Sequence, residues 1–163
     1  MKRLIALLIC IVTLFSFVSC SDGLTKYSSD KGLSIRLPEG FTEVSMAGAT
    51  YALSGEHGYF IAMRDDFDGM YSKYEFPSTA SLFDYAQFII AGNEIETQIA
   101  VRGKDDLYFT YTSAAEGQEE YFYYATVRKG SDAFWLCQFA CKSSLKELNS
   151  PLFDEWSYNI TVD

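Results

Sequence analysis

The sequence has a single histidine and few basic residues. One imidazole excludes histidine-rich metal sites, and any nucleophile–histidine pair would depend on His57, which lies in a glycine-flanked turn. We expect His57 to be an exposed turn residue. The chain carries 13 Lys and Arg against 22 Asp and Glu, which gives a formal net charge of −9. Because clustered Lys and Arg hold nucleic acids and anionic headgroups, this balance argues against a nucleic-acid partner and against a basic membrane-binding patch.

The amino-terminal apolar run, residues 4–18, is too short to cross a membrane. It has 15 residues, whereas a spanning helix needs about 20. Lys2 and Arg3 precede it and polar residues follow, which is the pattern of an export signal. At residues 17–20 the chain resembles the lipobox of bacterial lipoproteins, in which a small residue precedes a cysteine that is diacylated and becomes the mature amino terminus. Phe17 stands where the pattern usually has Leu.

The lipobox resemblance implies that residues 1–19 are a signal peptide and that Cys20 carries the lipid. Two acyl chains hold a protein stably, so we expect it to be extracytoplasmic and anchored to the cell membrane, or to the outer membrane of a Gram-negative envelope. The alternative is ordinary signal-peptidase cleavage after Cys20, which would give a secreted protein. Residues 20–30 are short and polar and predict a flexible tether. Residues 31–163 have the length of one domain.

Few cysteines remain for that domain. Cys10 is lost with the signal, which leaves Cys137 and Cys141 in a predicted strand. At about 3.3 Å per residue their Cα atoms would lie roughly 13 Å apart, beyond the reach of a disulfide. We therefore expect two buried thiols and no disulfide.

Apolar periodicity predicts a mostly β domain with two helices. The predicted strands are residues 32–37, 41–45, a hairpin at 51–53 and 59–64, a meander at 97–101, 107–113, 120–128 and 133–141, and a short last piece at 159–162. Residues 65–79 show no clear period. Ser81 and Asp84 form a capping-box pattern that starts a helix ending at residues 92–93. A second capping box at residues 144–147 predicts a helix that is interrupted at residues 150–151.

Both residue sets of the meander strands are apolar. In residues 133–141, Phe134 and Leu136 point one way, and Trp135 and Cys137 point the other. A sheet wet on one face would alternate apolar with polar residues, so helices should cover both faces. The predicted fold class is α+β, with a mainly antiparallel sheet between helices in an α/β/α sandwich.

The two ends of the domain resemble the PsbP-like superfamily. Residues 27–41 run through Pro38 to Phe41 and are similar to its first strand, and residues 133–163 resemble its last long strand, terminal helix and tail. Its members include a subunit of the photosynthetic oxygen-evolving complex, a Ran-binding nuclear import factor and many uncharacterised bacterial lipoproteins. They share no active site, and they associate with larger partners. The resemblance implies the same sandwich and a non-catalytic binding or accessory role for an envelope protein.

Residues 64–75 partly match an EF-hand calcium loop. Asp66, Asp68 and Glu75 fall at its third, fifth and twelfth positions. Arg64 occupies the first ligand position, and a strand is predicted where the motif needs a helix. We expect a solvated acidic loop, with calcium binding as the alternative.

Tyrosine is abundant, and some tyrosines could line a groove for a glycan or a peptide, which makes a small-ligand or glycan-binding lipoprotein an alternative function. The candidates are Tyr71 and Tyr74 in the long loop, and Tyr108, Tyr121 and Tyr123 in the strands. Core packing is the simpler explanation for most of them.

The sequence shows no catalytic set, so we expect neither enzymatic activity nor a cofactor. A hydrolase with carboxylates at Asp65 and Asp66, or at Asp105 and Asp106, is the alternative. Adjacent residues on a strand point to opposite faces, so neither pair forms a dyad by itself.

Overall fold

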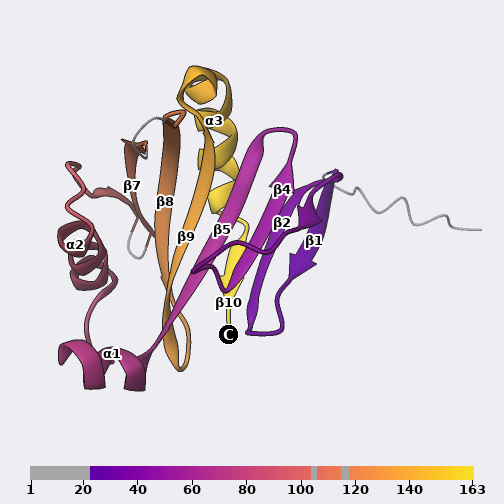
Figure 1. The fold of residues 1–163 in the computed structure, drawn as a ribbon. Coiled ribbons are helices and arrows are strands. Elements are labelled where there is room, and N and C mark those ends of the chain that lie inside the picture. The colour runs from indigo at the N-terminus through magenta and orange to yellow at the C-terminus, as the bar shows by residue number, and fades with distance from the viewer. Residues whose placement is uncertain (1–22, 104–105, 115–117) are drawn as a thin grey trace, which may run out of the picture.

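The computed structural model describes residues 23–103, 106–114 and 118–163, and it contains two antiparallel sheets (Figure 1). The smaller sheet has the order β1-β2-β10, with β1 (Leu24–Ser28), β2 (Leu33–Pro38) and β10 (Ile160–Val162). The larger sheet has the order β3-β4-β5-β9-β8-β7-β6. Its strands are β3 (Thr42–Glu43), β4 (Tyr51–Gly55), β5 (Gly58–Asp66), β6 (Ala100–Arg102), β7 (Asp106–Ser113), β8 (Tyr121–Lys129) and β9 (Ala133–Lys142).

Helices lie on both faces of the larger sheet. One face packs against α1 (Phe67–Tyr74) and α2 (Leu82–Gly92), and the other packs against α3 (Lys146–Ser157), which follows the short 3₁₀ turn η1 (Ser143–Leu145). The smaller sheet packs on the same face of the larger sheet as α3. Strand β9 lies between β5 and β8 and is buried along nearly its whole length, as its two apolar residue sets predict. The predicted α+β sandwich is confirmed, with the smaller sheet as an addition.

The predicted start of α2 is confirmed. The Ser81 hydroxyl accepts a hydrogen bond from the Asp84 backbone N–H at 3.1 Å, and the Asp84 carboxylate accepts one from the Ser81 N–H at 2.9 Å. These bonds satisfy two backbone donors that a helix start leaves open. The Ser81 hydroxyl also donates to the Asp84 carboxylate at 2.7 Å, and this bond, together with the one from the Ser81 N–H, lowers the pKa of Asp84 below its usual value.

The flexible tether predicted for residues 20–30 is wrong over β1. Strand β1 pairs with β2 along its whole length, from Leu24 opposite Pro38 to Ser28 opposite Ser34. Tyr27 donates a hydrogen bond to the Pro38 carbonyl at 3.3 Å and packs on Phe41. The first described strand therefore begins at Leu24, whereas the predicted signal peptide and Cys20 lie outside the described residues.

Helix α1 occupies part of residues 65–79, where no element was predicted. Met70 is its one fully buried residue, and Phe67 packs edge-on against Phe134 with ring centres 4.9 Å apart. A helix of eight residues with so few core positions has too short an apolar stripe for a recognisable period. Packing on β5 and β9 stabilises it instead.

The predicted interruption of the last helix is also wrong. Helix α3 continues through Pro151, and its N-cap, Leu145, makes no side-chain cap bond, so the capping box at residues 144–147 does not form. A proline inside a helix costs about 3 kcal/mol. Burial of Phe153 and Trp156 offsets this cost, since a fully buried large apolar side chain contributes roughly 1.5–3 kcal/mol.

Cys137 and Cys141 are buried and unpaired in β9, as expected. Burial raises the pKa of the Cys137 thiol to about 12, which makes this sulfur unreactive at neutral pH. In residues 23–103, 106–114 and 118–163, no helix has the length and apolar character needed to cross a bilayer.

Candidate functional site

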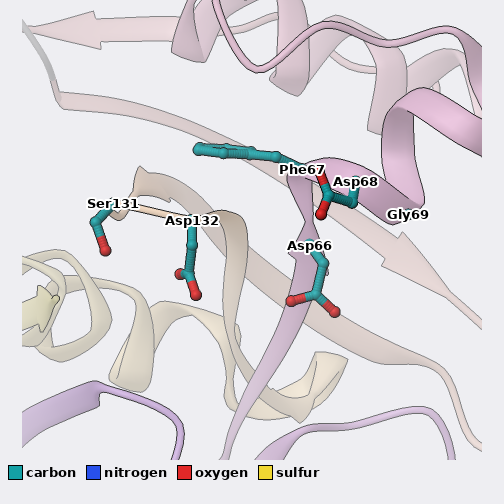
Figure 2. A pocket seen from close by; sticks show the side chains of 6 residues that line it. All are labelled: Asp66, Phe67, Asp68, Gly69, Ser131 and Asp132. Atoms are coloured by element: carbon teal, nitrogen blue, oxygen red, sulfur yellow. The ribbon is translucent and has the colours of Figure 1, made fainter.

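A cavity of about 510 Å³ opens at the corner where β5 passes into α1. Figure 2 shows its lining, which we call the acidic cavity: Asp66, Phe67, Asp68 and Gly69 from the corner, and Ser131 and Asp132 from the turn between β8 and β9. Three of its six residues are carboxylates. Two of them, Asp66 and Asp68, belong to the predicted calcium loop, and Asp132 joins them from the distant turn.

Backbone and ion-pair contacts hold the corner and the turn together. The Phe67 N–H donates to the Asp132 carbonyl at 3.0 Å. The Arg64 guanidinium pairs with Asp66 and, at 2.6 Å, with Asp132. Arg64 is mostly buried, whereas both carboxylates are well exposed. The Arg64 guanidinium therefore pairs with two of the three carboxylates, and the lining of the cavity keeps an excess of negative charge.

The last residue of the chain supports the same turn. The Ser131 N–H donates to the Asp163 carbonyl at 2.9 Å, and the Asp163 N–H donates to the Gly32 carbonyl at 2.9 Å. A Cβ at Gly130 would lie 2.3 Å from the Asp163 carbonyl oxygen, so this position needs glycine. The carboxyl terminus thus links the smaller sheet to the wall of the acidic cavity.

The calcium alternative receives no support from this geometry. Helix α1 occupies most of the predicted loop, and Glu75 follows the helix in the left-handed region at φ 55°. Arg64 already pairs with Asp66. Across the part of the chain that the structure describes, no group of three or more His, Cys, Asp or Glu side chains is placed to hold a metal ion.

The carboxylates of the hydrolase alternative are bound to other side chains. Asp65 accepts a hydrogen bond from the buried Tyr85 hydroxyl at 2.6 Å. Asp106 lies between two guanidinium groups, 2.9 Å from Arg102 Nε and 3.2 Å from Arg128 Nη1. Asp105 lies outside the described residues. The structure therefore gives Asp65 and Asp106 structural partners and does not bring them to the acidic cavity.

A cation–π contact that the sequence does not predict, between Arg102 and two tyrosine rings, joins β6 to α3. The Arg102 guanidinium lies between the rings of Tyr108 and Tyr158, 4.6 and 4.3 Å from their centres. It also pairs with Asp154 and donates to the Ser157 hydroxyl at 2.8 Å. Arg102 and Asp154 are far apart in the sequence, and no local pattern marks their contact.

His57 is half-buried, rather than the exposed turn residue that the sequence predicts. Its Nδ1–H donates to Asn149 Oδ1 at 3.1 Å, and Asn149 Nδ2 donates to the His57 carbonyl at the same distance. The imidazole also meets Trp156 edge-on, with ring centres 5.6 Å apart. These contacts attach the β4–β5 turn to α3, so the role of His57 in the fold is structural.

The candidate tyrosines lie in three separate places. Tyr71 and Tyr74 are exposed on α1, rather than in a loop. Tyr108 stacks on Tyr124 at 5.1 Å on the α3 face of the sheet. Tyr121 and Tyr123 are half-buried on β8; Tyr123 stacks on Tyr111 at 4.8 Å, and Tyr121 lies 6.5 Å from Tyr59. The five tyrosines therefore do not line a common groove.

Comparison with solved structures decides the fold. The chain is similar to the solution structure of cyanobacterial PsbP (CyanoP) from Synechocystis sp., with a TM-score of 0.55 and 12% sequence identity, over 86% of this chain and 93% of that chain. The fold is PsbP-like. The chain is also similar to a crystal structure from Bacteroides thetaiotaomicron, with a TM-score of 0.55 and 14% identity, over 86% of this chain and 49% of that one.

Sequence comparison adds no closer relative. No protein-family model matches the chain, and no curated protein matches it in sequence. At 12–14% identity the likeness extends to the PsbP-like fold and not to a shared site, because one fold can carry unrelated functions. The sequence resemblance at residues 27–41 and 133–163 is thus confirmed at the level of the fold.

Proposed function

We propose that the protein is a bacterial lipoprotein that is tethered outside the cytoplasm through Cys20 and binds an envelope protein without catalysing a reaction. The lipobox resemblance at residues 17–20 supports the tether. The PsbP-like fold supports an accessory role, by analogy only.

The proposal that the protein is not an enzyme is supported by the contacts of the candidate carboxylates, which are already bound to other side chains. Asp65 is held by Tyr85, Asp66 by Arg64, and Asp106 by two arginines. A general acid or base must reach a substrate proton with a free carboxyl oxygen. Carboxylates that are bound to guanidinium groups are poorly suited to that task.

The alternative of a glycan or small-ligand site finds less support. Such sites need several side chains to converge on one concave surface. The candidate tyrosines are divided between α1 and the two faces of the larger sheet. We therefore propose a protein partner in preference to a glycan or a small ligand.

Replacement of the proposed lipid-attachment residue tests the tether. Cys20→Ser protein, produced in a bacterial host with its signal, should move from the membrane fraction to the soluble extracytoplasmic fraction and keep its thermal unfolding temperature. Cys10→Ser is the matched control, because Cys10 lies inside the signal and should leave the membrane fraction unchanged. If mass spectrometry of the wild-type protein finds a mature chain that begins at Ser21 and carries no lipid, the lipoprotein proposal is wrong.

Capture from solubilised membranes tests the partner. The lipidated protein should co-purify with one envelope protein in a fixed ratio that persists through size-exclusion chromatography. A protein that elutes alone, and whose unfolding temperature rises with a member of a glycan or small-molecule library, would favour the ligand-binding alternative.

A further inference from the structure

The folded domain begins very close to the proposed lipid-attachment residue. Only Ser21, Asp22 and Gly23 separate Cys20 from Leu24, the first residue of β1. An extended chain advances at most about 3.6 Å per residue, so the four steps from Cys20 to Leu24 span roughly 14 Å. A diacylated Cys20 would therefore keep the start of β1 near the lipid headgroups.

The strand register shows which turns and strand ends lie beside the start of β1. Leu24, at the start of β1, lies opposite Pro38, at the end of β2. From Pro38 the chain continues through Phe41 into β3, which pairs with the end of β4. The β4–β5 turn and the end of β9, where η1 begins, lie at this same end (Figure 1). We call it the amino-terminal end.

The acidic cavity lies at the opposite end. Strand β5 runs from the β4–β5 turn at Gly58 to the cavity at Asp66, and its nine residues span about 26 Å at 3.3 Å per step. A molecule with the cavity against the membrane would hold Leu24 farther from the lipid than four residue steps can reach. The short connection between Cys20 and Leu24 therefore requires the amino-terminal end, and not the end with the acidic cavity, to face the membrane.

Two exposed leucines lie at the amino-terminal end. Leu145 and Leu148 fall at i and i+3 in η1 and the first turn of α3, with 40% and 65% of their surface exposed. This spacing places both side chains on one face of the turn. Lys146 and Lys142 flank them, and Lys142 pairs with Glu119 at 2.9 Å. The exposed carboxylates at this end limit the depth of any contact, because a carboxylate is costly in hydrocarbon; they are Glu56, Glu119, Glu120 and Glu147.

We propose, on the basis of the lipid tether put forward above, that the amino-terminal end rests on the bilayer surface with Leu145 and Leu148 at headgroup depth. The tether keeps this end at a high local concentration beside the lipid, so a weak apolar contact is enough to orient the domain. The acidic cavity then points away from the membrane, toward the solvent.

Fluorescence quenching by headgroup-labelled lipid tests this orientation. Leu148→Cys and Tyr71→Cys form a matched pair, because the native side chains are 65% and 64% exposed and lie on α3 and α1, toward opposite ends. Cys137 and Cys141 are buried and should not take up the fluorophore. The lipidated variants are reconstituted in phosphatidylethanolamine–phosphatidylglycerol vesicles that carry a nitroxide headgroup quencher. Fluorescence at position 148 should be quenched several-fold more than at position 71.

A flexible Gly-Ser spacer of about ten residues between Gly23 and Leu24 provides the second arm. It should reduce the difference in quenching while the protein still floats with the vesicles. Equal quenching at positions 148 and 71 in floating protein, or stronger quenching at 71, would overturn the orientation and leave the tether intact. Failure of the lipidated protein to float would overturn the tether, and the orientation with it. Thermal unfolding of each labelled variant should match that of the unlabelled protein, because both positions are exposed.

Discussion

Asn149 is a buried polar residue whose partners lie on a distant turn. It is 1% exposed, and its amide makes two hydrogen bonds to His57, 92 positions away in the sequence. A buried amide without partners would cost more than its bonds contribute, so Asn149 depends on the β4–β5 turn keeping its place. In this way one residue couples the β4–β5 hairpin to α3.

Asn149→Ala should lower the free energy of unfolding by about 1–3 kcal/mol, because it leaves polar groups of His57 without partners. The effect should be smaller in a His57→Ala background, where the two changes remove the same bonds. Urea denaturation of the two single variants and the double variant measures this coupling. Asn159→Ala is the control, since the Asn159 side chain makes no hydrogen bond within the described residues. Additive effects of Asn149→Ala and His57→Ala would contradict the pairing.

Sequence spacing predicts some residue-level features and misses others. The opposite directions of Asp65 and Asp66 follow from the two-residue repeat of a strand. The unpaired state of Cys137 and Cys141 follows from the rise of about 3.3 Å per residue, which separates them too far for a disulfide. The pairs Arg64–Asp132 and His57–Asn149 join segments that only the complete fold brings together. Of the three carboxylates in the acidic cavity, the sequence pattern therefore singled out Asp66 and Asp68 but not Asp132.

At the level of elements, local signals predict α2, the β4–β5 hairpin and the meander. Each has its own marker: the capping box at Ser81, the glycines at residues 55 and 58, and long apolar strands. Strand β1 has polar residues at Thr25 and Lys26 because it forms an edge of the smaller sheet. An edge strand buries little, so its sequence resembles a linker.

Pro151 allows a test of the continuity of α3. Replacement by Ala restores a backbone N–H that can donate to the Glu147 carbonyl, four residues earlier. The variant removes the cost of a proline inside a helix, but its unfolded chain is more flexible and therefore has a higher entropy. The net effect should be an increase of about 1–2 kcal/mol in the free energy of unfolding. Guanidinium denaturation measures the change. Ser150→Ala in the same turn should alter stability by about 0.5 kcal/mol or less. A loss of stability in Pro151→Ala would mean that the proline starts a separate helical turn.

The whole molecule should lose stability sharply in alkali. Burial raises the pKa of Tyr111 and Cys137 to about 12, from ordinary values of 10.0 and 9.0, and it also raises the pKa of Tyr85 and Tyr124. The folded state therefore keeps protons that the unfolded chain releases. This contribution to stability is complete below pH 9 and is lost as pH rises toward the folded-state pKa values.

Each of these four groups should reduce the free energy of unfolding by about 1.4 kcal/mol per pH unit once its unfolded-state pKa is passed. Denaturation curves at a series of pH values from 8 to 11 measure the slope, which should steepen above the ordinary tyrosine pKa of 10.0. Tyr111→Phe should make the slope shallower, because it removes a phenol whose pKa burial raises. Equal slopes for Tyr111→Phe and the parent protein would contradict the proposed effect of burial.

The carboxyl terminus holds the two sheets together. Deletion of residues 160–163 removes Ile160, which is 5% exposed, and both backbone bonds of Asp163. The expected loss is about 3–5 kcal/mol, from one buried aliphatic side chain and the backbone hydrogen bonds. Urea denaturation checks it, with a Gly-Ser extension after Asp163 as the control, since the extension leaves those backbone groups in place. Deletion without loss of stability would show that β10 is dispensable.

If the protein is exported and lipidated as proposed above, strand β10 also affects the order of events. Ile160 pairs with Ile35, 125 positions earlier, so β2 lacks its second neighbour until the last few residues are available. A chain threaded through a membrane pore with its amino terminus first cannot close the smaller sheet while its tail is still inside. Residues 17–20 emerge long before that point. Attachment of lipid would thus come first, and the domain would complete its folding at the membrane surface, already anchored.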